Sequence, residues 1–131
     1  MTDDPEALLL KAAESLAGAE SEFVMGRYNN CANRCYYACF QAAVSALRRA
    51  GIARRGEEWG HDFVQAQFAG HLVNRRKLYS PVLRDVLPRC FALRQTADYE
   101  GQQITETQAS RALRRTREFV GSVQGKGANS R

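Results

Sequence analysis

Apolar residues recur at helical spacing along almost the whole chain, and no long segment alternates apolar and polar positions as a half-buried strand would. The sequence Asp4-Pro5 is typical of a helix start, with a capping residue followed by a first-turn proline. Gly26 ends this first helix, and a second is predicted from about residue 30 to residue 50, with Gly51 beyond it. The apolar stripe of the first helix consists of Leu8, Ala12, Leu16, Ala19 and Phe23.

A polar, glycine-punctuated loop separates these helices from two more. A short helix begins near His61, and Pro81 starts a fourth helix that is predicted to run to about Tyr99. Pro88 lies inside this fourth helix, so we expect a kink near Arg84, whose carbonyl loses its hydrogen-bond partner.

The last helix is predicted to follow Thr105, because Thr105-x-x-Gln108 is a capping-box pattern. Residues 125–131 are rich in Gly, Ser and Asn, and we expect them to form a disordered tail. We find no internal repeat, so residues 1–124 should form a single domain. The fold predicted is an all-α bundle of four to five antiparallel helices.

Charge is distributed unevenly over the 131 residues, whose formal net charge is +5. Residues 1–22 hold six acidic side chains and one basic one, a net of −5, so the remainder carries +10, mostly as arginine. This excess fits either a solvated surface or one that binds a polyanion such as RNA. No apolar stretch could span a membrane, and the acidic N-terminus is unlike a signal peptide, so we expect a cytoplasmic protein.

The four cysteines are interpreted as core residues. Cys31, Cys35 and Cys39 are four residues apart on one face of the second helix, where they resemble small packing residues, and Cys90 stands apart. Neither a disulfide framework nor the closely spaced pairs of a zinc site is evident. We therefore expect no metal and no cofactor.

Two charged residues stand where the apolar pattern of the fourth helix expects buried or interface positions. The stripe of Leu83, Leu87 and Phe91 continues by helical steps to Arg94 and Asp98. An intrahelical pair in this orientation would contribute only about 0.2–0.5 kcal/mol. A functional site or a helix interface explains the two residues better. His61, at a helix start and near neutral pKa, is the better of the two histidines as a catalytic candidate.

The second helix carries the segment Asn33-Arg34-Cys35-Tyr36-Tyr37-Ala38-Cys39-Phe40. Adjacent tyrosines point to different faces, so at most one of them lies fully in the core. Packing with hydrogen-bonded phenols is the interpretation we favour for both. Asn33 needs a polar partner if it is buried.

Together with His61 and Arg94-x-x-Ala97-Asp98-Tyr99, this segment resembles the HEPN superfamily, over nearly the whole chain. The resemblance implies a homodimeric helical bundle, often a metal-independent ribonuclease and often a toxin encoded beside a nucleotidyltransferase antitoxin. It also implies a catalytic motif of Arg, four to six residues, then His. Arg94 matches the motif arginine, but residues 95–100 contain no histidine, and Asp98-Tyr99 stands in that place.

Two hypotheses follow. In the first, an endoribonuclease uses Arg94 to stabilise developing charge, His61 as base or acid, and Asp98 to orient His61. In the second, a non-catalytic dimerisation or interaction module contacts a partner through Arg94 and Asp98, and a nucleotidyltransferase modifies Tyr99. Asn33 and Tyr37 are further candidates for substrate contact or modification. A nucleotide-binding module is a weaker alternative, because the sequence has no Gly-rich phosphate loop. Proximity of His61 to Arg94 and Asp98 would favour the enzyme.

Overall fold

The computed structural model describes residues 4–99 and 102–129, and it is all-α, which confirms the predicted fold class. Within these ranges the chain forms five α-helices and two short helical segments of other types. The segment η1 is π-helical and continues α3, and η2 is a single 3₁₀ turn. In chain order they are α1 (Pro5–Val24), α2 (Tyr28–Arg49), α3 (His61–Gln67), η1 (Phe68–Arg75), η2 (Pro81–Leu83), α4 (Val86–Tyr99) and α5 (Glu106–Asn129).

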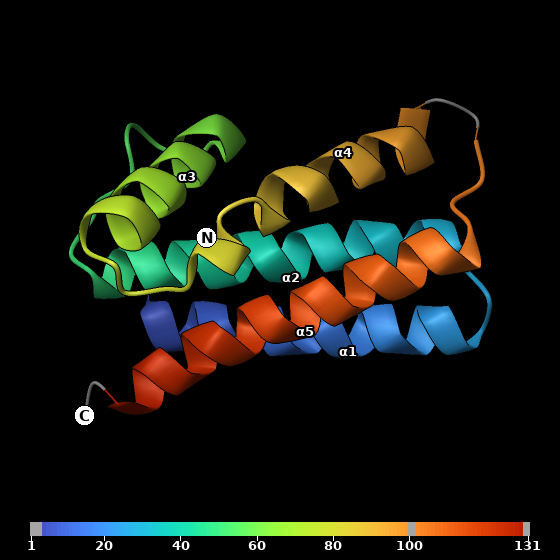
Figure 1. Ribbon diagram of the computed structural model, residues 1–131, viewed down its shortest axis with the longest axis horizontal. Helices are drawn as coiled ribbons and strands as arrows, with labels where there is room; N and C mark the ends of the chain where they lie inside the picture. Colours follow the sequence, from blue (N-terminus) through green and yellow to red (C-terminus); the bar gives the residue numbers. More distant parts are fainter. Residues whose placement is uncertain (1–3, 100–101, 130–131) are drawn as a thin grey trace.

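Helix α2 is the centre of the bundle. Figure 1 shows α1 and α5 on one side of α2, and α3 and α4 on the other. Each of these four helices packs directly against α2, and α1 also packs against α5. Residues on one face of α2 therefore pack against α1 and α5, and residues on the other face pack against α3 and α4. The face toward α3 and α4 carries the candidate site.

The predicted helix ends are confirmed where a capping pattern defined them. Asp4 accepts a hydrogen bond from the Glu6 backbone N–H (3.1 Å), with Pro5 as the first helical residue of α1. Gly26 has φ +75°, a left-handed conformation that ends α1 and that glycine adopts without strain. Thr105 and Gln108 form the reciprocal bonds of a capping box (2.9 and 3.1 Å).

The prediction that the cysteines lie in the core is confirmed: all four are buried and carry free thiols. Cys39 and Cys90 lie close to the fully buried Thr116 of α5, with Sγ to Oγ1 distances of 3.5 and 3.7 Å. The Thr116 hydroxyl donates to the Ala112 carbonyl (2.8 Å), so this buried polar group is satisfied within its own helix.

The fourth predicted helix differs from the structure, because it is broken rather than kinked. Pro81 begins the short η2 turn, and α4 begins anew at Val86. Pro88 is then the third residue of α4, in the first turn, where the backbone N–H that proline lacks would have no intrahelical partner. The proline is thus accommodated by a fresh helix start. No kink at Arg84 is needed.

The chain end differs as well, since α5 continues to Asn129, past the Gly125 at which a disordered tail was predicted. Val120 and Val123 are fully buried, so tertiary packing holds the preceding turn of α5. Each further residue then adds one hydrogen bond to an existing helix, which offsets the poor propensity of Gly, Ser and Asn. Among the described residues no helix is long and apolar enough to cross a membrane.

Candidate functional site

Tyr36 is the centre of the candidate site. It lies on the face of α2 that meets α3 and α4, and only 5% of it is exposed. Its ring packs against aromatic side chains of three helices, with centroids 5.3–5.8 Å away: Tyr37, Phe40, His61 and Phe91. Such pairs stabilise both the packing and its geometry. The ring therefore ties α2, α3 and α4 together at one point.

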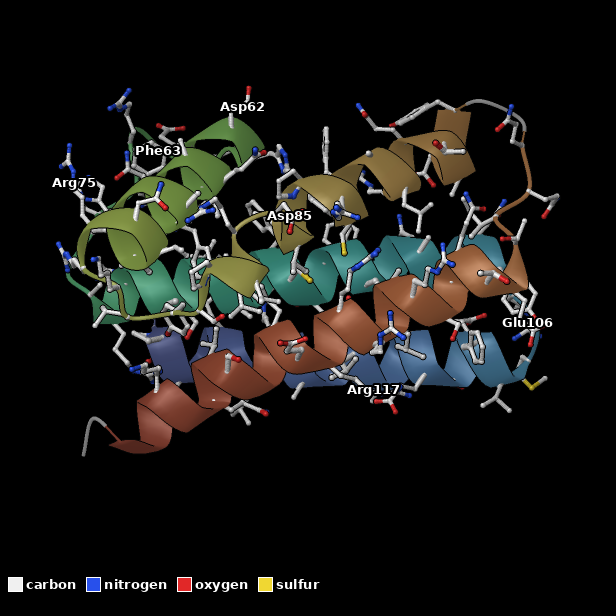
Figure 2. The ribbon with its side chains drawn as sticks, in the orientation of Figure 1. Asp62, Phe63, Arg75, Asp85, Glu106 and Arg117 are labelled. Atoms are coloured by element: carbon white, nitrogen blue, oxygen red, sulfur yellow. The ribbon has the colours of Figure 1, made fainter. Side chains whose placement is uncertain are left out.

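His61 is the first residue of α3 and follows Gly60. Its Nδ1 lies 3.2 Å from the Tyr36 hydroxyl, within hydrogen-bond distance. Its ring stacks on Phe91 of α4, with centroids 3.8 Å apart and planes inclined by 21°. One face and one nitrogen of the imidazole are thus fixed. The neighbouring Asp62 points away from the bundle into solvent (Figure 2).

Arg94 approaches the same tyrosine from α4. Its guanidinium carbon lies 5.0 Å from the Tyr36 ring centroid and 5.2 Å from that of Tyr37, so the guanidinium makes cation–π contacts with both rings. Its Nε lies 3.3 Å from Asp98 Oδ2 but out of line for a hydrogen bond, and this nitrogen is closed off from solvent. The side chain as a whole remains 23% exposed. Arg94 is therefore anchored by several contacts, and its side chain is still partly exposed.

Burial sets the protonation of the site. It lowers the pKa of His61 below its ordinary 6.5; Asp62 and Gln65 oppose this effect in part, and the charge of Arg94 adds a smaller lowering. His61 is thus predominantly neutral at pH 7. Burial also raises the pKa of Tyr36, an effect that Arg94 partly offsets, so the phenol keeps its proton. A neutral imidazole can accept a proton, and the guanidinium that contacts the same tyrosine can attract an anion.

The structure brings together four of the six residues singled out from the sequence: His61, Arg94, Asp98 and Tyr37. It pairs Asp98 with Arg94, whereas the sequence hypothesis had Asp98 orient His61; the residue that contacts His61 Nδ1 is Tyr36. Within the described part of the chain, no hydrogen bond or ring contact joins the half-buried Asn33 to this group. Tyr99, 75% exposed, stands at the end of α4.

Sequence reasoning missed the structural role of two residues here. Tyr36 and Phe91 were interpreted as packing residues, and they are, but they also hold His61 and Arg94 at one place. The available indication was the Tyr36-Tyr37 pair, whose members point to different faces, so that one of them could face the core and meet other helices. Among the described side chains, no group of three or more His, Cys, Asp or Glu residues could hold a metal ion.

Comparison with known families gives a match over almost the entire chain. The model of a family described as HEPN domain matches residues 5–126. A comparison with curated proteins finds no match. The matched region contains every helix that contributes to the candidate site.

Proposed function

The chain belongs to the HEPN family, and we propose that it is a metal-independent endoribonuclease in which His61 and Arg94 act on one phosphodiester. The observation that carries this proposal is the convergence of the two residues, from different helices, on the Tyr36 ring. A base candidate and a cation are thereby held together although the family's motif histidine is missing after Arg94.

The reaction uses the nucleophile that RNA itself contains. His61 accepts the proton of a ribose 2′-hydroxyl as the 2′-oxygen bonds to the adjacent phosphorus. The bond from phosphorus to the 5′-oxygen breaks, and this oxygen takes up a proton from solvent. The products are a 2′,3′-cyclic phosphate and a 5′-hydroxyl end. Arg94 stabilises the negative charge that develops on the phosphoryl oxygens.

Tyr36 and Asp98 act as positioning residues. In the tautomer that accepts a proton at Nε2, His61 Nδ1–H donates to the Tyr36 hydroxyl, so this contact favours the tautomer that the reaction needs. Asp98 holds Arg94 through an ion pair within one helix, at 3.3 Å. The rings of Tyr36 and Tyr37 also contact the guanidinium.

The direct test is cleavage of a single-stranded RNA by purified protein in the presence of EDTA. We expect products with 2′,3′-cyclic phosphate ends, and His61→Gln should lower the rate by about 100-fold, because general-base catalysis commonly contributes this much. His71→Gln is the matched control, since His71 lies in η1 and contributes to no contact of the site. Absence of cleavage by the wild-type protein, or equal rates for both variants, would contradict the proposal.

The pH dependence of the same assay separates a base from a merely structural histidine. Because the pKa of His61 is lowered, the neutral form persists below pH 6.5. Cleavage should therefore decline as the pH falls through this lowered pKa, below the 6.5 of an ordinary imidazole, because the imidazole takes up a proton. The residual activity of His61→Gln should lack this decline. If the wild-type protein and His61→Gln had the same dependence of cleavage rate on pH, His61 would not be the base.

A second candidate function rests on Tyr99. Its phenol is 75% exposed at the end of α4 and directly follows Asp98, so a partner enzyme could reach it. In this alternative the domain is a homodimeric interaction module, or the toxin of a pair. A nucleotidyltransferase transfers a nucleoside monophosphate from a nucleoside triphosphate to the tyrosine oxygen, which loses its proton, and pyrophosphate is released.

Co-expression with a nucleotidyltransferase encoded beside the protein tests this candidate. Intact mass should rise by one nucleoside monophosphate unit, and the increase should disappear in Tyr99→Phe. It should persist in Tyr79→Phe, because Tyr79 is buried. A protein that remains unmodified and unbound after co-expression would count against this alternative.

A further inference from the structure

A groove separate from the candidate site runs between α4 and α5. Its volume is about 350 Å³, at the lower end of the range for small-molecule sites. Its lining includes Arg89, Leu93 and Thr96 of α4, and Gln108, Arg111 and Arg115 of α5. In Figure 1 the two helices, in ochre and orange, face each other on the right of the bundle.

The groove lies on the side of α4 that faces away from the candidate site. Arg89, Leu93 and Thr96 follow one another at helical spacing and form one stripe of α4. Arg94 is displaced from this stripe by about 140° around the helix axis, at 100° per residue, and it contacts α2. A ligand in the groove would therefore not replace the contacts of Arg94.

Positive charge dominates this groove. Three arginines line it, and the described lining contains no acidic residue. Arg89 is paired with Asp85 (2.7 Å), which lies outside the lining. Arg111 and Arg115 form no ion pair with any residue that the structure describes. They stand four residues apart on α5, an arrangement of like charges that destabilises a helix unless an anion lies between them.

The polar groups beside the arginines also favour an anion. The Gln108 side-chain oxygen already accepts the Thr105 backbone N–H, so its amide nitrogen is the part left to donate. Leu93, Ala92 and Ala112 supply apolar lining between the polar groups. Arginine forks together with an amide donor and an apolar floor suit a phosphate with its attached sugar.

We propose that this groove binds the phosphate of a nucleotide unit, in the first place a phosphodiester of single-stranded RNA. The choice of RNA as the source of that phosphate rests on the proposed function. The groove would hold the strand by its backbone, away from the reacting group, so it contributes affinity without base selectivity. A free mononucleotide is the other source with the same chemistry.

The test is the binding of a fluorescent single-stranded RNA that is fully 2′-O-methylated, measured by anisotropy at several salt concentrations. This probe lacks the 2′-hydroxyl nucleophile, so binding is measured whether or not the protein cleaves RNA. The double variant Arg111→Ala/Arg115→Ala should bind at least about tenfold more weakly. The slope of log affinity against log salt should become shallower by about 1.4, the value for two lost contacts to a single strand.

The matched control is Arg114→Ala/Arg117→Ala, which removes two charges from the same helix outside the groove. Figure 2 shows Arg117 projecting from α5 on the side of α1, where it pairs with Glu20 at 3.1 Å. The control should retain wild-type affinity within about twofold. If both double variants weakened RNA binding equally, the effect would come from overall charge, and the groove would not be the binding site.

A competition arm with AMP identifies the source of the phosphate. If the groove variant lost the ability to bind AMP but bound RNA as the wild-type protein does, RNA would not be the ligand of the groove. Because the methylated probe cannot be cleaved, binding that depends on the groove, without cleavage of ordinary RNA, would contradict the proposed function while leaving the proposed groove site intact.

Discussion

Arg94→Ala is expected to lower RNA cleavage by about 10²- to 10³-fold, the usual cost of removing one group that stabilises transition-state charge. The guanidinium contacts the same tyrosine as His61, and the tyrosine rings and Asp98 together hold it in place. Arg94→Lys should recover only part of the rate, because an ammonium keeps the charge but lacks the planar fork that binds two phosphoryl oxygens.

A loss of folding would not explain this result. An ion pair between residues four apart contributes about 0.2–0.5 kcal/mol, and each of the two cation–π contacts of the partly exposed Arg94 contributes about 0.5–1 kcal/mol. The variant should therefore remain folded, with a melting temperature lowered by only several degrees. Arg117→Ala provides the control, since it also breaks an arginine–carboxylate pair, but on α5 and far from α2's site face. Unchanged cleavage by Arg94→Ala would exclude the assigned role.

The fold was predictable from the sequence because its signals are local. Asp4-Pro5, Gly26 and the Thr105-x-x-Gln108 box each specify a helix end through hydrogen bonds within a few residues. The break between η2 and α4 was not predictable in the same way. It depends on whether Pro88 lies inside a helix or in its first turn, and tertiary packing decides this.

The candidate site could be predicted only in part. Arg94 and Asp98 were recognised because charged residues interrupted an apolar stripe, and they do pair. Their distance from His61 could not be read from the sequence, since it depends on how α3 and α4 cross α2. The partner of His61 was therefore assigned wrongly to Asp98 rather than to Tyr36. A buried aromatic gives the same apolar signal whether or not it supports a site.

Tyr36→Ala should lower the free energy of unfolding by about 3–5 kcal/mol, the range for removing a large aromatic side chain from a core. Tyr36 is 5% exposed and packs against four rings, so its removal leaves a cavity where α2, α3 and α4 meet. A loss of this size is a large fraction of the stability of a small domain. Urea unfolding followed by circular dichroism measures it directly.

Tyr36→Phe separates the ring from the hydroxyl. It keeps the packing and the contact of the ring with Arg94, and it loses only the bond to His61 Nδ1, which should cost about 0.5–1.5 kcal/mol. Cleavage by the Phe variant should fall less than that by His61→Gln, because the imidazole remains stacked on Phe91 but is less well oriented. If Tyr36→Ala destabilised the protein no more than Tyr36→Phe, the ring would not be what joins the three helices. The site would then need another support, since His61 and Arg94 meet through this side chain.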